Sequence, residues 1–95
     1  MSIDGALLER RLDELYASGA EAGGGTYRPL YGDAWSVAGE RVEQWMRADE
    51  LQVRRDAVGN LWGRIEGREG GPAIVTGSHL DTVRRGGRLD GALGI

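Results

Sequence analysis

Three residues near the end of this 95-residue chain have the types and spacing for metal chemistry. They are His79, which is the only histidine, then Asp81 and, beyond a Gly-rich loop, Asp90. The apolar run Ala73–Ser78 before them is typical of a buried strand. Because side chains alternate along a strand, His79 and Asp81 are expected to point the same way where that strand ends.

This geometry suits a metal-binding imidazole with a carboxylate behind it. The Asp81 carboxylate would accept the second ring N–H of His79, fix the tautomer and make the other nitrogen a better ligand. The loop of ten residues between His79 and Asp90 is long enough to bring Asp90 beside the ring. Two ordinary alternatives stay open: His79 can be a structural or exposed histidine, and Asp90 can cap a helix that starts at Gly91.

The loop itself allows other interpretations. Residues 86–91 lack the Lys and Ser/Thr of a P-loop and do not match G-x-G-x-x-G, so a phosphate cradle is excluded. The three arginines Arg84, Arg85 and Arg88 could attract an anionic substrate or form an ordinary solvated surface. Both possibilities stay open for them.

Composition narrows the class of protein. The net charge of −3 predicts no strong attraction to nucleic acid or to an anionic membrane. Cysteine is absent, which excludes a disulfide framework, a thiol nucleophile and a thiolate metal site. The start of the sequence does not fit a signal peptide, and no apolar run approaches the roughly 20 residues that span a bilayer. We therefore expect a soluble, cytoplasmic protein.

Two helices are predicted ahead of the site. The first covers about Ile3–Ser18, where leucines at 8, 12 and 15 share one face opposite charged residues. The second starts at Asp33 or Ser36, either of which can act as its cap, and ends near Asp49. Its apolar stripe, interpreted as core, consists of Trp35, Ala38, Val42, Trp45 and Met46.

A hairpin follows the helices. Leu51–Arg55 and Leu61–Ile65 are predicted strands, and Gly59-Asn60 between them tolerates the positive φ that a hairpin turn needs. With the buried strand and the start of a further helix after Asp90, this order resembles the opening of an α/β domain. A parallel strand needs a crossover helix and a neighbouring strand, and the sequence stops within that helix. The sequence therefore predicts one truncated, N-terminal part of a larger catalytic domain over residues 1–95.

Two motifs carry a family resemblance. Gly77–Val83 with Gly86–Gly94, and upstream Asp56–Arg64 with Trp45-Met46, resemble the N-carbamoyl-L-amino-acid hydrolases and allantoate amidohydrolases. These form the amidohydrolase branch of the zinc aminoacylase and carboxypeptidase superfamily. The resemblance implies a three-layer α/β/α zinc-hydrolase catalytic domain, of which this chain is the N-terminal fragment without the dimerisation or lid domain.

The same resemblance implies roles for the site residues. His79 would bind one metal ion, Asp90 would bridge two ions and Asp81 would orient His79. The two divalent ions would be zinc, with manganese or cobalt as alternatives. The site would hydrolyse a linear C–N amide or ureido bond of a small-molecule substrate, of the N-carbamoyl-L-amino acid or allantoate type.

The resemblance also implies what this sequence lacks. The general base, from a Glu-Glu pair, and the remaining ligands would lie downstream of Ile95, so the chain alone is expected to be inactive. The complete enzyme would be a homodimer. The alternative is a non-catalytic remnant or an interaction module that retains the metal motif by descent.

Overall fold

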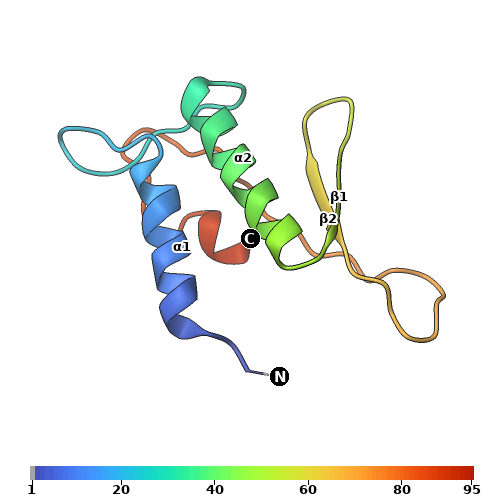
Figure 1. Ribbon diagram of the computed structural model, residues 1–95. Coiled ribbons are helices and arrows are strands. Elements are labelled where there is room, and N and C mark those ends of the chain that lie inside the picture. The colour runs from blue at the N-terminus through green and yellow to red at the C-terminus, as the bar shows by residue number, and fades with distance from the viewer. Residues whose placement is uncertain (1) are drawn as a thin grey trace. The chain divides into compact units, whose positions relative to one another are not determined.

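The computed structural model describes residues 2–95 and contains two helices, one β-hairpin and a short 3₁₀ turn in that order (Figure 1). Their bounds are α1 Gly5–Ala17, α2 Asp33–Ala48, β1 Gln52–Arg55, β2 Leu61–Arg64 and η1 Ala92–Gly94. The chain divides into two compact units, of which the second is Gly39–Thr76. The first unit takes the residues up to Ala38 together with Gly77–Ile95, and it contains all three predicted site residues.

Helix α1 starts two residues later than predicted because Asp4 caps it. The Asp4 carboxylate accepts a hydrogen bond from the backbone N–H of Leu7 at 3.0 Å, an interaction worth about 1 kcal/mol in typical helices. Leu12 and Leu15 are buried, as the leucine spacing predicted, while Leu8 remains partly exposed. Burying only the second half of the leucine face leaves the start of the helix accessible.

Helix α2 starts at the earlier of its two predicted positions. Of its predicted apolar stripe, Ala38 and Val42 are buried. Trp35, Trp45 and Met46 are only half-buried. The periodicity therefore identified the inward face of α2 and overstated how completely that face is covered.

The hairpin has the predicted antiparallel pairing, with each strand one residue shorter than expected. Its connecting turn is organised by the Asp56 carboxylate, which accepts hydrogen bonds from the backbone N–H groups of Val58 and Asn60. The side chains of Asn60 and Trp62 donate to the same carboxylate, at 2.8 and 3.1 Å. Gly59 supplies the positive φ, 91°, that the turn requires.

The predicted buried strand Ala73–Ser78 is wrong for this structure. The segment forms no strand and is exposed throughout, with Ile74 fully accessible and Val75 70% exposed. A strand needs a hydrogen-bonded neighbour. Among residues 2–95 the sheet consists of β1 and β2 alone, so this apolar run has the composition of a buried strand but no pairing partner.

The prediction of a helix after Asp90 is also wrong. Only the single 3₁₀ turn Ala92–Gly94 forms, with Ala92 buried. Within the part of the chain that the structure describes, no helix has the length and apolar character needed to cross a membrane.

Candidate functional site

The three predicted site residues lie together in the first unit. The Nε2 atom of His79 is 3.9 Å from Oδ1 of Asp90, and its Nδ1 atom is 3.5 Å from Oδ1 of Asp81. All three side chains are about half exposed. The fold therefore brings one imidazole and two carboxylates into a single solvent-accessible cluster.

The His79 ring is oriented by the backbone of Asp81. Nδ1 lies 2.8 Å from the carbonyl oxygen of Asp81, closer than it lies to the carboxylate of the same residue. A carbonyl oxygen can only accept, so Nδ1 carries the proton and Nε2 of the neutral ring keeps a lone pair on the side of Asp90. The sequence predicted that the Asp81 carboxylate accepts from the His79 ring. In the structure the Asp81 backbone carbonyl is the closer acceptor, and the carboxylate lies beside it.

The turn after Asp90 packs directly against His79. Gly91 has φ 74°, and a Cβ at this position would lie 2.4 Å from the His79 carbonyl oxygen and 2.7 Å from its ring carbon Cε1. The Ser78 hydroxyl donates to the Gly91 carbonyl at 2.7 Å. A glycine is therefore required here by both its backbone angle and its contact with the ring.

Asp90 does not cap a helix in this structure. The residue preceding η1 is Gly91, and no side-chain hydrogen bond caps that turn. The helix-cap alternative for Asp90 is therefore wrong, and its carboxylate is left beside the Nε2 edge of the imidazole.

A polar network that the sequence did not indicate supports the segment around Asp81. The backbone of Thr26 exchanges two hydrogen bonds with Gly86, at 3.0 and 2.7 Å. The backbone of Arg28 also forms two hydrogen bonds with Thr82. The Arg28 N–H donates to the Thr82 hydroxyl at 2.8 Å, and the Thr82 N–H donates to the Arg28 carbonyl at 2.9 Å. Residues 26–28, predicted as loop, therefore pair with residues 82–86, which lie between Asp81 and Asp90.

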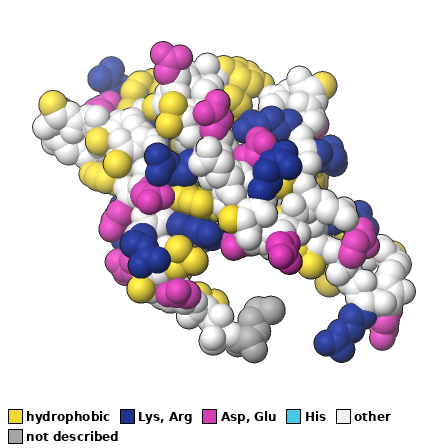
Figure 2. Space-filling model, viewed as in Figure 1, with side chains coloured by type: hydrophobic (Ala, Val, Ile, Leu, Met, Phe, Trp, Pro, Cys, Tyr) yellow, Lys and Arg dark blue, Asp and Glu magenta, His cyan; other side chains and the backbone are white. Residues whose placement is uncertain are grey.

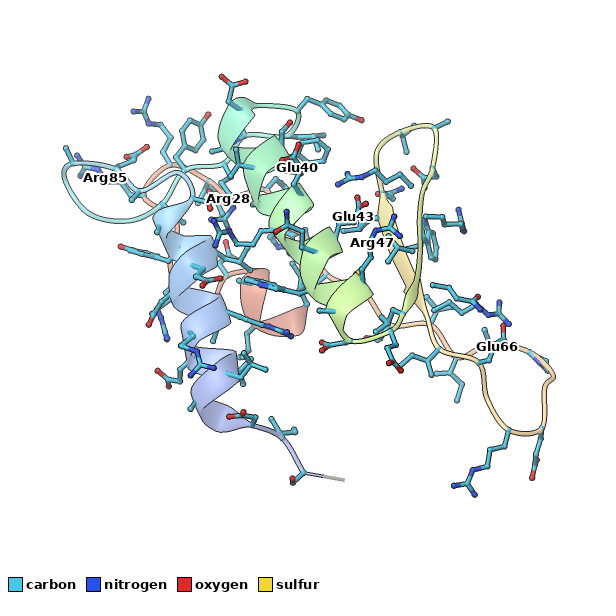
Figure 3. The ribbon with its side chains drawn as sticks, in the orientation of Figure 1. Arg28, Glu40, Glu43, Arg47, Glu66 and Arg85 are labelled. Atoms are coloured by element: carbon cyan, nitrogen blue, oxygen red, sulfur yellow. The ribbon has the colours of Figure 1, made fainter. Side chains whose placement is uncertain are left out.

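Arg28 is the buried cation of this network. Its side chain is 1% exposed and lies at the C-terminal end of α1 (Figure 3). Nε donates to the Leu80 carbonyl at 2.9 Å, and Nη1 donates to the carbonyls of Leu15 and Ser18. Burial lowers the pKa of this guanidinium below its usual value. No periodicity or motif marks a buried arginine, because its acceptors come from segments distant in sequence.

A second arginine ties the site loop to the surface of α1. Arg88 Nε lies 2.7 Å from Oδ1 of Asp13, and Nη2 lies 3.2 Å from a Glu9 carboxylate oxygen. The hydrogen bond that Arg88 donates to the Asp13 carboxylate raises the pKa of Arg88. Of the three arginines singled out in the sequence, Arg88 is therefore engaged by carboxylates of the protein, while Arg84 is 78% exposed near Glu21.

Charged side chains of both signs are interleaved over the visible surface (Figure 2). The Glu43 carboxylate, for example, accepts hydrogen bonds from Arg47 and Arg55, which lower its pKa. Two shallow depressions are lined by residues of α2 in one case and by residues at the start of α1 in the other. Neither depression is lined by His79, Asp81 or Asp90, whose side chains are about half exposed.

The donor set fits part of a metal site. An imidazole nitrogen and carboxylate oxygens are ligands that zinc accepts, and 3.9 Å between Nε2 and Oδ1 is too long for a direct hydrogen bond. Among residues 2–95, however, no three His, Cys, Asp or Glu side chains form a group able to hold a metal ion. A metal ion held by His79 Nε2 and Asp90 Oδ1 would therefore need ligands beyond these two.

The chain is similar to known amidohydrolases in sequence and fold. It is 42% identical over 88 residues to the allantoate amidohydrolase of Escherichia coli (strain K12), covering 92% of this chain and 21% of that protein. It is 43% identical over 89 residues to the N-carbamoyl-L-amino-acid amidohydrolase of Paenarthrobacter aurescens, covering 93% and 21%. A crystal structure of a hydantoinase/carbamoylase family amidase from Burkholderia ambifaria matches with a TM-score of 0.91 and 41% identity, over 98% of this chain and 23% of that one.

No protein-family model matches the chain. The chain spans about a fifth of the length of the curated relatives described above. Its two helices and antiparallel hairpin agree with the corresponding part of the solved amidase, which confirms the predicted α/β fragment and the predicted resemblance. In sequence and fold, the chain therefore corresponds to one part of the amidohydrolases that include the allantoate amidohydrolases and the N-carbamoyl-L-amino-acid amidohydrolases.

Proposed function

We propose that the chain is the N-terminal part of the catalytic domain of a metal-dependent amidohydrolase. The reaction is hydrolysis of a linear C–N amide or ureido bond in a small molecule of the allantoate or N-carbamoyl-L-amino acid type. The names of the relatives support this class of substrate. The structural observation that carries the proposal is the convergence of His79 Nε2 and Asp90 Oδ1 at 3.9 Å.

In this proposal His79 binds one divalent ion and Asp90 bridges two. The ions are zinc, with manganese or cobalt as alternatives, and when bound they supply an activated water and polarise the scissile carbonyl. The contribution of the chain is to prepare the ligands. The Asp81 carbonyl accepts a hydrogen bond from Nδ1 of His79, an arrangement that in the neutral ring leaves the Nε2 lone pair available to a metal ion.

The proposal also assigns the remaining functions to parts outside this sequence. A water nucleophile needs a base that takes its proton, and the described site offers only Asp81 and Asp90 beside the imidazole. The Asp90 carboxylate is assigned to metal binding, and the Asp81 carboxylate lies beside Nδ1 rather than beside Nε2, the nitrogen that would bind the metal. We therefore assign the base and the other ligands to a further segment, within a homodimeric enzyme in the cytoplasm.

A chimera tests this proposal. The chain replaces the matching residues of the Escherichia coli allantoate amidohydrolase, to which it is 42% identical. The folded chimera should hydrolyse allantoate or an N-carbamoyl-L-amino acid only when it holds divalent metal, and His79→Ala should abolish turnover. Arg68→Ala, at an exposed loop position, is the matched control and should leave turnover unchanged. A folded, metal-loaded chimera without activity would instead favour a non-catalytic remnant.

A further inference from the structure

The environment of Arg28 is unusual for a charged residue. Its side chain is 1% exposed, and within the described residues its recorded partners are three main-chain carbonyls and the Thr26 hydroxyl. No carboxylate of the described chain forms an ion pair with it. Burying a charge without an anionic partner is costly unless its donors are all used by well-placed acceptors. Such an arrangement needs a specific role to explain it.

The Nη1 side of the guanidinium contacts the end of α1. The carbonyls of Leu15 and Ser18, which accept from Nη1, lie at the C-terminal end of that helix. This end carries the negative pole of the helix dipole and carbonyls that lack helical partners. A positive charge there stabilises α1, and a lysine ammonium could do the same.

The Nε side of the guanidinium contacts the main chain between His79 and Asp81. Nε donates to the carbonyl of Leu80, the residue between His79 and Asp81. The main chain of Arg28 meanwhile pairs with Thr82 on the far side of Asp81. Arg28 therefore bonds to the residues on both sides of Asp81, which are Leu80 and Thr82. The Asp81 carbonyl between them is the acceptor for Nδ1 of His79.

We propose that Arg28 is a positioning residue for His79: by fixing the Leu80 carbonyl it keeps the Asp81 carbonyl on Nδ1 and so directs the Nε2 lone pair toward Asp90. Only the metal-binding consequence rests on the proposed function; the ring orientation itself does not. Lysine is a poor substitute, because one ammonium lacks the planar fork that reaches α1 and Leu80 together.

The unique histidine makes this testable. In the 95-residue chain labelled with ¹⁵N-histidine, a two-bond ¹H–¹⁵N spectrum at a pH where the ring is neutral reports one imidazole, His79. The wild type should show the Nδ1–H tautomer. Arg28→Lys should shift the ring toward the Nε2–H tautomer while the amide signals of Leu12 and Leu15 remain native. The control Arg84→Lys, at an exposed arginine of the same segment, should leave the tautomer unchanged.

A folded Arg28→Lys chain with an unaltered tautomer would overturn the proposal and leave Arg28 as a helix cap only. If Arg28→Lys loses the native amide signals of α1, the variant is not folded there, and a second measurement that keeps Arg28 tests the proposal. In the chimera described above, which supplies the remaining ligands, adding Zn²⁺ should slow the exchange of the Arg28 Nε–H, since coupling between two sites is reciprocal, and should not do so in His79→Ala. Bound Zn²⁺ without this slowing would overturn the proposal. A tautomer shift in the 95-residue chain, together with a folded chimera that binds no divalent metal, would overturn the proposed function and leave the positioning role intact.

Discussion

Arg88 Nε lies 2.7 Å from Oδ1 of Asp13, across 75 positions of sequence, and so joins the loop before Asp90 to α1. The same guanidinium reaches Glu9 one helical turn earlier. Two arginines therefore connect α1 with the site, because Arg28 contacts the end of the helix and Arg88 contacts its exposed face. The segment from His79 to Asp90, which contains the candidate metal ligands, is therefore linked to α1 at two places, through Arg28 at Leu80 and through Arg88.

Removing the outer contact should loosen the loop without unfolding the chain. In Arg88→Gln the charge pairing with Asp13 and Glu9 is lost, and amides of residues 84–90 should exchange with solvent several-fold faster. Added salt should produce a similar change in the wild type, because exposed pairs are screened. Hydrogen exchange followed by mass spectrometry measures this, with Arg68→Gln as control. Unchanged exchange in Arg88→Gln would show that the pair does not hold the loop.

Gly91→Ala should disturb the imidazole more than any other small change near it. The new Cβ would lie 2.4 Å from the His79 carbonyl, and the positive φ would add strain of about 1–3 kcal/mol. We expect a displaced ring and Zn²⁺ binding weakened about 10-fold or more. Gly87→Ala is the control, since no atom lies within 4 Å of its Cβ. Calorimetric titration with Zn²⁺ compares the two variants in the chimera described above, and equal affinities would contradict the close packing of Gly91 on His79.

The hairpin turn should respond to acid at an unusually low pH. Hydrogen bonds from the side chains of Asn60 and Trp62 lower the pKa of Asp56 to about 2. Because the folded pKa is depressed, the stabilisation by this carboxylate is complete above its ordinary pKa of 3.8 and is lost as the pH falls through about 2. The Trp62 indole N–H resonance should therefore move with a midpoint near pH 2. In Asp56→Asn this transition should disappear; a wild-type midpoint near pH 4 would contradict the network.

The exposed run Ala73–Ser78 should promote association of the isolated chain. Ile74 is fully accessible and Val75 is 70% exposed, and contiguous apolar surface of this kind favours aggregation. Ile74→Asp should reduce the associated fraction, measured by light scattering after size-exclusion chromatography. Val58→Asp, at a single exposed apolar residue of the hairpin turn, should change it little. A monodisperse wild-type monomer would count against this expectation.

The elements that could be predicted from sequence depend on nearby residues. Helices α1 and α2 follow from local apolar spacing, and the hairpin follows from two short strands around Gly59-Asn60. The proximity of His79 and Asp90 also follows from a short loop between them. In these cases the residues that determine the structure lie within about a dozen positions of one another.

The features that could not be predicted depend on distant partners. Ala73–Ser78 has strand composition but no neighbouring strand in the described chain. Arg28 is buried because carbonyls from Leu15 and Leu80 happen to surround it, more than fifty positions separating Arg28 from Leu80. The main-chain acceptor on His79 was missed for a related reason, since spacing predicts which side chains meet but not which backbone oxygen lies closest.

The most direct test of the metal site is the metal content of three variants in the chimera described above, after equal dialysis. Asp90→Ala removes the proposed bridging ligand and should lose most of both ions. His79→Ala removes a ligand from one ion and should lose about one ion per site. Asp81→Asn keeps the backbone carbonyl that holds Nδ1, so it should cost at most about 10- to 100-fold in affinity and retain the most metal. Full two-metal occupancy in Asp90→Ala would contradict the bridging role and with it the central claim.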